Sequence, residues 1–216
     1  IMPVPPRCLY CHNPDTQDLN SAAYELTPEE TFDRMKKYKN FYKDVGVTVS
    51  GGEPLLQPTF VKEFLQICHD AGMHTAIDTA GAYLSEDIKA VLELTDLVLL
   101  DIKCIDPDVH QSLTGKPLEP TLVFADYLAQ KGIPVWIRYV LVPGITDRED
   151  LIEKHADFIA GLKNVELVEI LPFHKLGTAK YEKLGRTYPL QNTPAPSPEQ
   201  IQKAKDIYSS RGLKVK

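Results

Sequence analysis

Val45-Gly-Val-Thr-Val-Ser-Gly-Gly-Glu-Pro54 is the stretch that decides the fold of this 216-residue chain. A short β-branched run ends at Ser50-Gly51-Gly52, a helical pattern follows over 58–71, and a second apolar run covers 74–77. A strand, a helix and a second strand in this order form a right-handed crossover, which makes the two strands parallel. The stretch therefore predicts an α/β fold.

The same strand-and-helix unit recurs along the chain. Continuous apolar runs are typical of parallel strands that helices cover. The predicted strands are 45–49, 74–77, 97–100, 135–142 and 165–171. The predicted helices are 58–71, 85–94, 120–131, 147–162 and 197–211, and an earlier one begins at the capping box Thr27-Pro-Glu-Glu30. We expect one domain over 1–216, built on a parallel sheet or barrel, because the chain is long enough to bury a full core.

The composition excludes several classes of protein. A formal net charge of −6 argues against a general nucleic-acid binder, which needs clustered Lys and Arg. No apolar run approaches the roughly 20 residues of a membrane span, and the start at Ile1 has no leader-like segment. Four cysteines are too few and too scattered for a disulfide framework in a chain of this length. We expect a cytoplasmic protein without nucleic-acid or membrane partners.

Cys8-Leu-Tyr-Cys11 places two thiols three residues apart at the start of a loop. By itself the pair fits zinc, redox or iron–sulfur chemistry about equally. A second Cys or His pair for zinc is not evident, and the strand–helix pattern that precedes a thioredoxin-type site is absent. Val4 stands four residues before Cys8, where a three-thiol cluster site would have its third cysteine. Cys68 and Cys104 are interpreted as packing residues.

Charged side chains gather where the predicted strands end, which is where β/α barrels place their chemistry. The residues at or near those ends are Glu53, Asp78, Asp101, Lys103, Arg138 and His174. Asp78 also fits an ordinary turn residue, and His174 a structural histidine. Asp101 and Lys103 also fit a local pair on one side of a strand. Arg138 lies inside an apolar run, where an unpaired charge is costly, so a functional role is favoured.

Six segments together resemble the radical S-adenosylmethionine family, and within it the group that activates glycyl-radical enzymes, such as the pyruvate formate-lyase activating enzymes. The segments are Arg7-Cys-Leu-Tyr-Cys-His-Asn-Pro-Asp-Thr16, Val47-Thr-Val-Ser-Gly-Gly-Glu-Pro54, Asp78-Thr-Ala-Gly81, Leu99-Leu-Asp-Ile-Lys103, Val135-Trp-Ile-Arg-Tyr-Val-Leu-Val-Pro-Gly144 and Leu171-Pro-Phe-His-Lys-Leu-Gly177. The resemblance covers nearly the whole chain in family order and implies a partial (β/α)6 TIM-like barrel. Only five strands are visible, so the first strand is expected to be missing ahead of Cys8.

The resemblance implies an oxidoreductase with a four-iron four-sulfur (4Fe-4S) cluster and S-adenosylmethionine as cofactors. In such enzymes, reductive cleavage of S-adenosylmethionine gives a 5′-deoxyadenosyl radical, which abstracts hydrogen from one glycine of a partner enzyme of anaerobic metabolism. The expected partners are a glycyl-radical enzyme and an electron donor such as flavodoxin or ferredoxin. No Cys-rich domain is inserted between Asp18 and Glu25, which favours pyruvate formate-lyase as the glycyl-radical enzyme.

The resemblance also implies the roles of the site residues. The cluster ligands are Cys8 and Cys11. The residues around the methionine amino group are Ser50, Gly51, Gly52 and Glu53. The ligands of a monovalent cation beside the bound carboxylate are Asp78, Thr79 and Asp101. The residues that approach the adenine and ribose are Tyr10 and Asn13. The catalytic residues, which line the cofactor or the incoming glycine loop, are Lys103, Arg138 and His174.

Val4 departs from the family pattern, and two thiolates cannot reproduce a three-point anchor. The chain as written is therefore expected to bind the cluster poorly and to be inactive. A truncated or misjoined start, an altered chain that keeps the fold, and a degenerate copy are competing explanations; the first is favoured because the rest of the pattern is intact. Two other functions stay open: a cluster-free remnant that binds S-adenosylmethionine or the partner, and a radical S-adenosylmethionine enzyme with another substrate.

Overall fold

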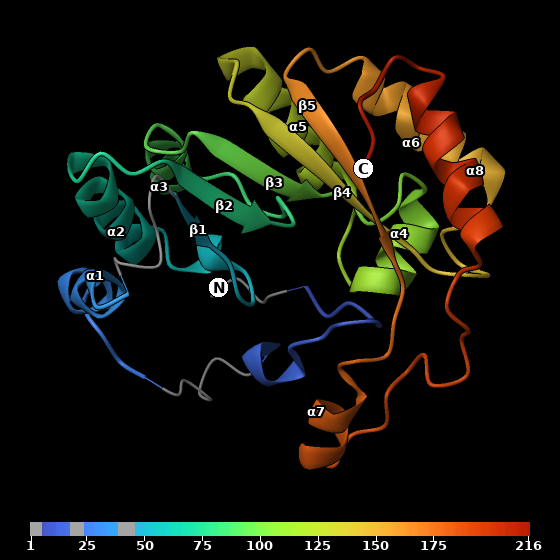
Figure 1. The fold of residues 1–216 in the computed structure, drawn as a ribbon, viewed down its shortest axis with the longest axis horizontal. Helices are drawn as coiled ribbons and strands as arrows, with labels where there is room; N and C mark the ends of the chain where they lie inside the picture. The colour runs from blue at the N-terminus through green and yellow to red at the C-terminus, as the bar shows by residue number, and fades with distance from the viewer. Residues whose placement is uncertain (1–5, 18–23, 39–45) are drawn as a thin grey trace.

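The computed structural model describes residues 6–17, 24–38 and 46–216 (Figure 1). Its centre is one parallel sheet whose five strands lie in chain order. The strands are β1 Val47–Val49, β2 Thr75–Thr79, β3 Leu97–Asp101, β4 Val135–Leu141 and β5 Val165–Pro172. The five predicted strands are thus confirmed, with Val45 outside the described residues. Val4 and the position expected for a missing first strand also lie outside them.

Helices connect and cover the strands. They are α1 Pro28–Lys36, α2 Pro58–Asp70, α3 Glu86–Leu92, α4 Pro107–Thr114, α5 Glu119–Lys131, α6 Glu149–Ala160, α7 Thr178–Lys183 and α8 Pro198–Ser209, with the 3₁₀ turns η1 Pro14–Gln17 and η3 Pro54–Leu56. The capping box of Thr27 with Glu30 is confirmed, and the Ser85 and Ser197 hydroxyls cap α3 and α8. The sequence prediction missed α4 and α7.

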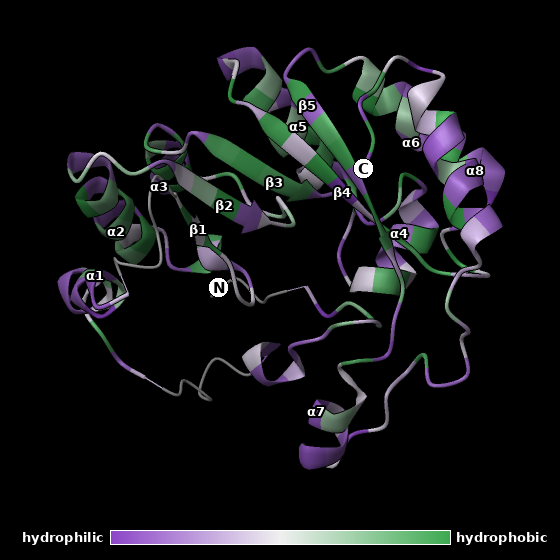
Figure 2. Cartoon of the chain, in the orientation of Figure 1, coloured by the Kyte–Doolittle hydropathy of each residue, from purple (hydrophilic) through white to green (hydrophobic). Residues whose placement is uncertain are grey.

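β4 shows how the sheet divides its side chains between a core face and a site face. Its residues alternate between buried and half-buried positions. On the core face, Tyr139 packs against His155 of α6 and Tyr208 of α8. Arg138, the neighbour of Tyr139, points to the opposite face of the sheet. Figure 2 shows the strands mostly hydrophobic and α8 mostly hydrophilic, as expected for a covered sheet.

Residues 6–17, here named the cysteine loop, carry Cys8 and Cys11 across the C-terminal ends of the strands. The backbone N–H groups of Arg7 and Leu9 donate to the carbonyls of Thr114 and Leu113 at the end of α4, each at 2.9 Å. The loop also contributes to a second apolar cluster, whose buried residues are Tyr10, Leu113, Val142, Phe173, Tyr181, Tyr188 and Leu190. Packing therefore fixes the loop against the barrel.

The last residues of the chain extend the pairing at β5. Val215 forms a parallel bridge with Val168, and the Lys216 N–H donates to the Val168 carbonyl at 2.9 Å. The Lys216 ammonium also donates to Glu169 Oε1 at 3.1 Å. In the described part of the chain, no helix is long and apolar enough to cross a membrane.

Candidate active site

A cavity of about 380 Å³ lies between the cysteine loop and the C-terminal ends of the strands. Every predicted site residue except Glu53 lines it. Those residues are Cys8, Tyr10, Cys11, Asn13, Ser50, Gly51, Gly52, Asp78, Thr79, Asp101, Lys103, Arg138 and His174. A larger cavity of about 580 Å³ lies between η3 and α5. Among the described residues that line it, only Glu119 is charged. We therefore place the chemistry in the strand-end cavity.

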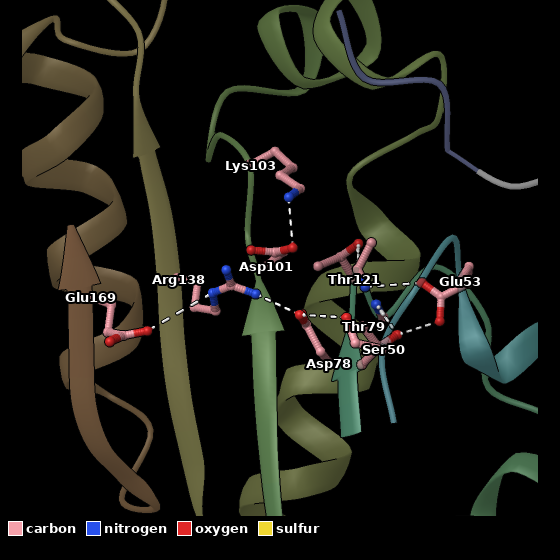
Figure 3. Close-up of polar contacts among 11 residues, drawn as sticks. Ser50, Glu53, Asp78, Thr79, Asp101, Lys103, Thr121, Arg138 and Glu169 are labelled. Atoms are coloured by element: carbon pink, nitrogen blue, oxygen red, sulfur yellow. Dashed lines mark hydrogen bonds and ion pairs between the residues drawn. The ribbon is translucent and has the colours of Figure 1, made fainter. Parts of the chain in front are cut away.

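Arg138 of β4 is the centre of the charges on the strand side (Figure 3). Strand register places it between Asp101 of β3 and Glu169 of β5. Its Nη1 donates to Asp78 Oδ2 at 2.6 Å, and its Nε lies 3.9 Å from Glu169 Oε2. The Ser50 hydroxyl donates to the same Asp78 oxygen at 3.0 Å. Burial lowers the pKa of Arg138, but the Asp101 and Asp78 carboxylates outweigh burial and raise it, so the guanidinium is charged.

Asp101 and Lys103 form a second charge pair at the end of β3. Lys103 Nζ lies 2.6 Å from Asp101 Oδ2, and their side chains are only 12% and 16% exposed. Burial lowers the pKa of Lys103, whereas the Asp101 carboxylate raises it, and the net shift is upward. Asp101 and Lys103 thus form the local pair expected for residues two apart on one side of a strand, and both also line the cavity.

Glu53 is buried and is absent from the lining of the cavity. Its Oε1 accepts hydrogen bonds from the Thr79 hydroxyl at 2.7 Å and the Leu55 N–H at 3.2 Å, and its Oε2 accepts from the Ala80 N–H at 3.0 Å. Burial raises the pKa of this carboxyl, and the hydrogen bonds oppose that rise. The side chain therefore joins the loop after β1 to the end of β2.

Cys8 and Cys11 lie on one turn of the cysteine loop, where the Cys11 N–H donates to the Cys8 carbonyl at 3.0 Å. Burial raises the pKa of the Cys8 thiol to about 11. Cys68 and Cys104 are fully buried and do not line the cavity, as their interpretation as packing residues predicts. Within the described ranges, no three His, Cys, Asp or Glu side chains are arranged to hold a metal ion.

The residues expected to bind a monovalent cation are engaged with protein groups. The Asp78 carboxylate accepts from Ser50 and Arg138, and the Thr79 hydroxyl donates to Glu53. The Thr79 oxygen also accepts from the Gly81 N–H at 3.0 Å. Of the oxygen atoms in this set, Asp101 Oδ1 is buried and has no hydrogen-bond partner.

The sequence prediction missed two residues of the site, His12 and Glu169. The His12 ring stacks on His174 with ring centres 4.3 Å apart, and His12 Nε2 lies 3.1 Å from the His174 carbonyl. Burial lowers the pKa of His12. Glu169, the acidic neighbour of Arg138, was also missed. The sequence could have indicated Glu169, because this residue is a charge inside an apolar run, as Arg138 is. It could have indicated His12, because this residue directly follows Cys11.

Three buried polar atoms around the cavity have no hydrogen-bond partner. They are the Tyr10 hydroxyl, Asp101 Oδ1 and Arg138 Nε. Buried polar groups are normally paired, so these three atoms mark polar side chains whose hydrogen bonding the protein itself leaves incomplete. Asp101 and Arg138 both line the cavity, so a ligand with an ammonium and a carboxylate group would meet one group of each opposite charge there.

Comparison with known proteins defines the class. The sequence profile of the Radical SAM superfamily matches residues 5–159. The chain is 42% identical to the pyruvate formate-lyase-activating enzyme of Listeria monocytogenes, covering 96% of this chain and 87% of that protein. It is 41% identical to the pyruvate formate-lyase 1-activating enzyme of Escherichia coli K12, covering 97% and 86%.

Solved structures agree with this assignment. A domain of a pyruvate-formate lyase-activating enzyme from Bacteroides vulgatus superposes with a TM-score of 0.68 at 32% identity, covering 80% of this chain and 98% of that one. A radical SAM methyltransferase from Sphaerobacter thermophilus, at 18% identity, has a TM-score of 0.72 over 97% of this chain and 61% of its own, which shows the fold alone. The chain belongs to the radical SAM superfamily, as an oxidoreductase of the pyruvate formate-lyase-activating enzyme family. Its fold is accordingly a partial TIM-like α/β barrel.

Proposed function

We propose that this protein activates a glycyl-radical enzyme by generating a carbon radical that removes hydrogen from one glycine of pyruvate formate-lyase. The observation that carries the proposal is the convergence of Cys8 and Cys11 with the strand-end charges on one cavity. The names of the relatives in Listeria and Escherichia supply the partner. An iron–sulfur cluster and S-adenosylmethionine, when bound, supply the reductive cleavage of a carbon–sulfur bond.

The chain's own residues bind and orient the cofactors in this proposal. The thiolates of Cys8 and Cys11 would hold iron of the cluster, and Ser50, Gly51 and Gly52 would meet the methionine end, with Glu53 buried behind them. Gly51 has a φ of 143°, and no heavy atom lies within 4 Å of the place where a Cβ would be, so a ligand can approach the backbone closely. Tyr10 and Asn13 bound the cavity on the side of the cysteine loop, for the adenine and ribose.

Lys103, Arg138 and His174 complete the cavity as the residues that meet the cofactor or the incoming glycine. The Arg138 guanidinium is held by ion pairs with Asp78 and Glu169 and lines the cavity, so it is a preorganised cation for a carboxylate. Lys103 keeps its charge through Asp101. The enclosing cysteine loop keeps water from the reacting carbon.

A monovalent cation at Asp78, Thr79 and Asp101 is also part of the proposal. Support comes from the oxygen atoms that the three side chains offer on one wall and from the unpaired Asp101 Oδ1. Binding would require the Asp78 carboxylate to share or exchange its contact with Arg138. The test is S-adenosylmethionine affinity by calorimetry in sodium, potassium and a large organic cation; equal affinity in all three rejects the cation.

Val4 determines whether this chain can carry a cluster. Two cysteines supply two of the three thiolates of the family's loop, so we propose that the chain as written loads and retains iron poorly. In anaerobic reconstitution, Val4→Cys should bind about four irons per chain with the absorbance and paramagnetic resonance of a 4Fe-4S cluster. Val4→Ser is the control, because it adds a polar atom but no thiol. Equal iron in Val4→Cys and the parent contradicts the proposal.

Activity is tested in the loaded Val4→Cys variant. Reduction in the presence of S-adenosylmethionine should yield methionine and 5′-deoxyadenosine, and purified pyruvate formate-lyase should acquire a glycyl-radical signal in paramagnetic resonance. Cleavage without that signal would favour a radical SAM enzyme with another substrate. A confirmed cluster without cleavage rejects the activity. Calorimetric binding of S-adenosylmethionine by the iron-free parent would instead support the cluster-free remnant that the Val4 substitution suggests.

A further inference from the structure

A basic surface with two exposed leucines covers the outer side of the cysteine loop. It consists of Lys175, Leu176, Lys180, Lys183, Leu184 and Arg186, and is named the α7 face. Residues 175–186 contain four basic residues and one acidic residue, Glu182, in a chain whose formal net charge is −6. Leu176, at 84% exposure, is the most exposed large hydrophobic side chain in the described ranges, and Leu184 is 45% exposed. Apolar side chains ringed by charge typify a protein-binding patch.

The α7 face rests directly on the loop that carries the thiols. Gly177 packs so closely that a Cβ there would lie 3.0 Å from His12 Cα and 3.3 Å from the Cys11 carbonyl. The Lys180 ammonium donates to Asn13 Oδ1 at 2.6 Å, and Arg186 Nη1 donates to Gln17 Oε1 at 3.3 Å. At Gly177 the segment that carries the α7 face is therefore in direct contact with the backbone of Cys11.

Aromatic side chains fill the space between α7 and the cysteine loop. Tyr181 of α7 and Tyr188 pack edge to face with ring centres 5.0 Å apart. Both belong to the buried cluster that also contains Tyr10, and Cys8 packs against that cluster. The surface and the thiols are thus joined by close-packed protein.

We propose that the α7 face is the docking surface for an acidic one-electron carrier protein, which gives up one electron that the iron site accepts. The inference rests on the proposed function, since only a reducible metal site needs such a carrier. Charge complementarity supplies the partner's sign: a positive patch on a negative protein selects a negative partner and raises its rate of encounter.

The position of the α7 face separates this carrier from the glycine-bearing partner. The glycine must reach the cavity, which lies between the cysteine loop and the strands. α7 lies on the other side of that loop, away from the sheet (Figure 1). Two proteins can therefore approach the site from different directions, one at the cavity and one at the α7 face.

The test measures binding of purified oxidised flavodoxin, an acidic flavin carrier, by calorimetry at low and high ionic strength. The variant Leu176→Glu with Lys183→Glu should bind about tenfold more weakly than the parent at low salt. The control, Val123→Glu with Lys163→Glu, makes the same charge change on another apolar side chain, 48% exposed, and another exposed lysine, and should stay within about twofold of the parent. Chemical denaturation verifies that both variants fold. Equal weakening in both variants, or none in either, overturns the proposal.

A small reductant separates this proposal from the proposed function. Dithionite needs no docking surface, so cleavage of S-adenosylmethionine with dithionite should be the same in the Val4→Cys background with and without the α7-face changes. With flavodoxin as the donor, cleavage should fall only in the α7-face variant. If dithionite gives no cleavage in Val4→Cys, either with or without the α7-face changes, the result counts against the proposed function. The docking surface is decided by the flavodoxin affinities alone.

Discussion

The two walls of the cavity are built in different ways. On the strand wall, Asp78, Asp101 and Arg138 sit on neighbouring strands and are fixed by ladder register and by ion pairs, of Asp78 with Arg138 and of Asp101 with Lys103. On the other wall, the cysteine loop contains only the turn η1 as regular structure and is held from outside. The contact between Asn13 and Lys180, for example, joins residues 167 positions apart. The strand wall is therefore preorganised by the sheet, whereas the position of the thiols depends on α4 and α7.

The largest effect should come from breaking the strand wall at its centre. Arg138→Met leaves Asp78 without a cation and removes the positive charge between Asp101 and Glu169, so the free energy of unfolding should fall by about 3 kcal/mol. Urea denaturation measures this loss. Cofactor cleavage in the Val4→Cys background should fall about 100-fold. Arg148→Met, which removes an exposed partner of Asp150, is the control and should leave stability unchanged. Equal stability of the two variants would show that the wall does not depend on Arg138.

A smaller effect should follow from loosening the connection between two strand ends. Glu53→Gln replaces an acceptor of three hydrogen bonds with a group whose NH₂ must face a donor, so the free energy of unfolding should fall by about 2 kcal/mol. Thermal or urea unfolding measures the change. Glu63→Gln, at an exposed position on α2, should have no effect. If both variants unfold alike, the buried carboxylate is not what joins β1 to β2.

The loop wall should respond less in stability and more in metal retention. Gly177→Ala places a methyl group against His12 and the Cys11 carbonyl, so the loop must shift, at a cost of about 1 kcal/mol. In the Val4→Cys background, this variant should release iron to a chelator faster than its parent. The control is Ala179→Ser, at an exposed position of α7 two residues further on, which should release iron at the parental rate. Unchanged retention in Gly177→Ala would mean that the close approach of α7 does not position the thiols.

The smallest effect concerns a single exposed contact of the loop wall. Lys180→Met removes the ammonium that contacts Asn13 and Asp15, and exposed pairs contribute under about 1 kcal/mol. Global stability should barely change, but amide hydrogen exchange of residues 13–17 should become faster. Lys183→Met on the same helix is the matched control. Equal exchange in both variants would assign the loop's order to packing alone.

The strand wall could be predicted because its signals are local. Apolar runs gave all five strands, and the charges at their ends gave every charged residue that lines the strand side of the cavity, although Glu169, which contacts Arg138 without lining the cavity, was missed. Thr27, Ser85 and Ser197 were visible as caps because capping needs only neighbouring residues. Glu53 was found, but the sequence does not indicate that its carboxylate turns toward Ala80.

The loop wall could not be predicted because its contacts are distant in sequence. His12 and His174 stack across 162 positions. α4 has a recognisable start, in which Asp106 caps the helix and Pro107 opens it, but the sequence reading left it out. α7 has six residues and no side-chain cap, so the packing of Tyr181 against the rest of the fold decides it.

The order of the strands bears on how the site is assembled during synthesis. Each strand pairs with the next one in the chain, so the sheet can grow in the order in which the ribosome delivers it. The cysteine loop emerges before all five strands, but α7, which covers it, emerges after them. Cys8 and Cys11 consequently lack the cover of this segment until Gly177 and α7 have been synthesised.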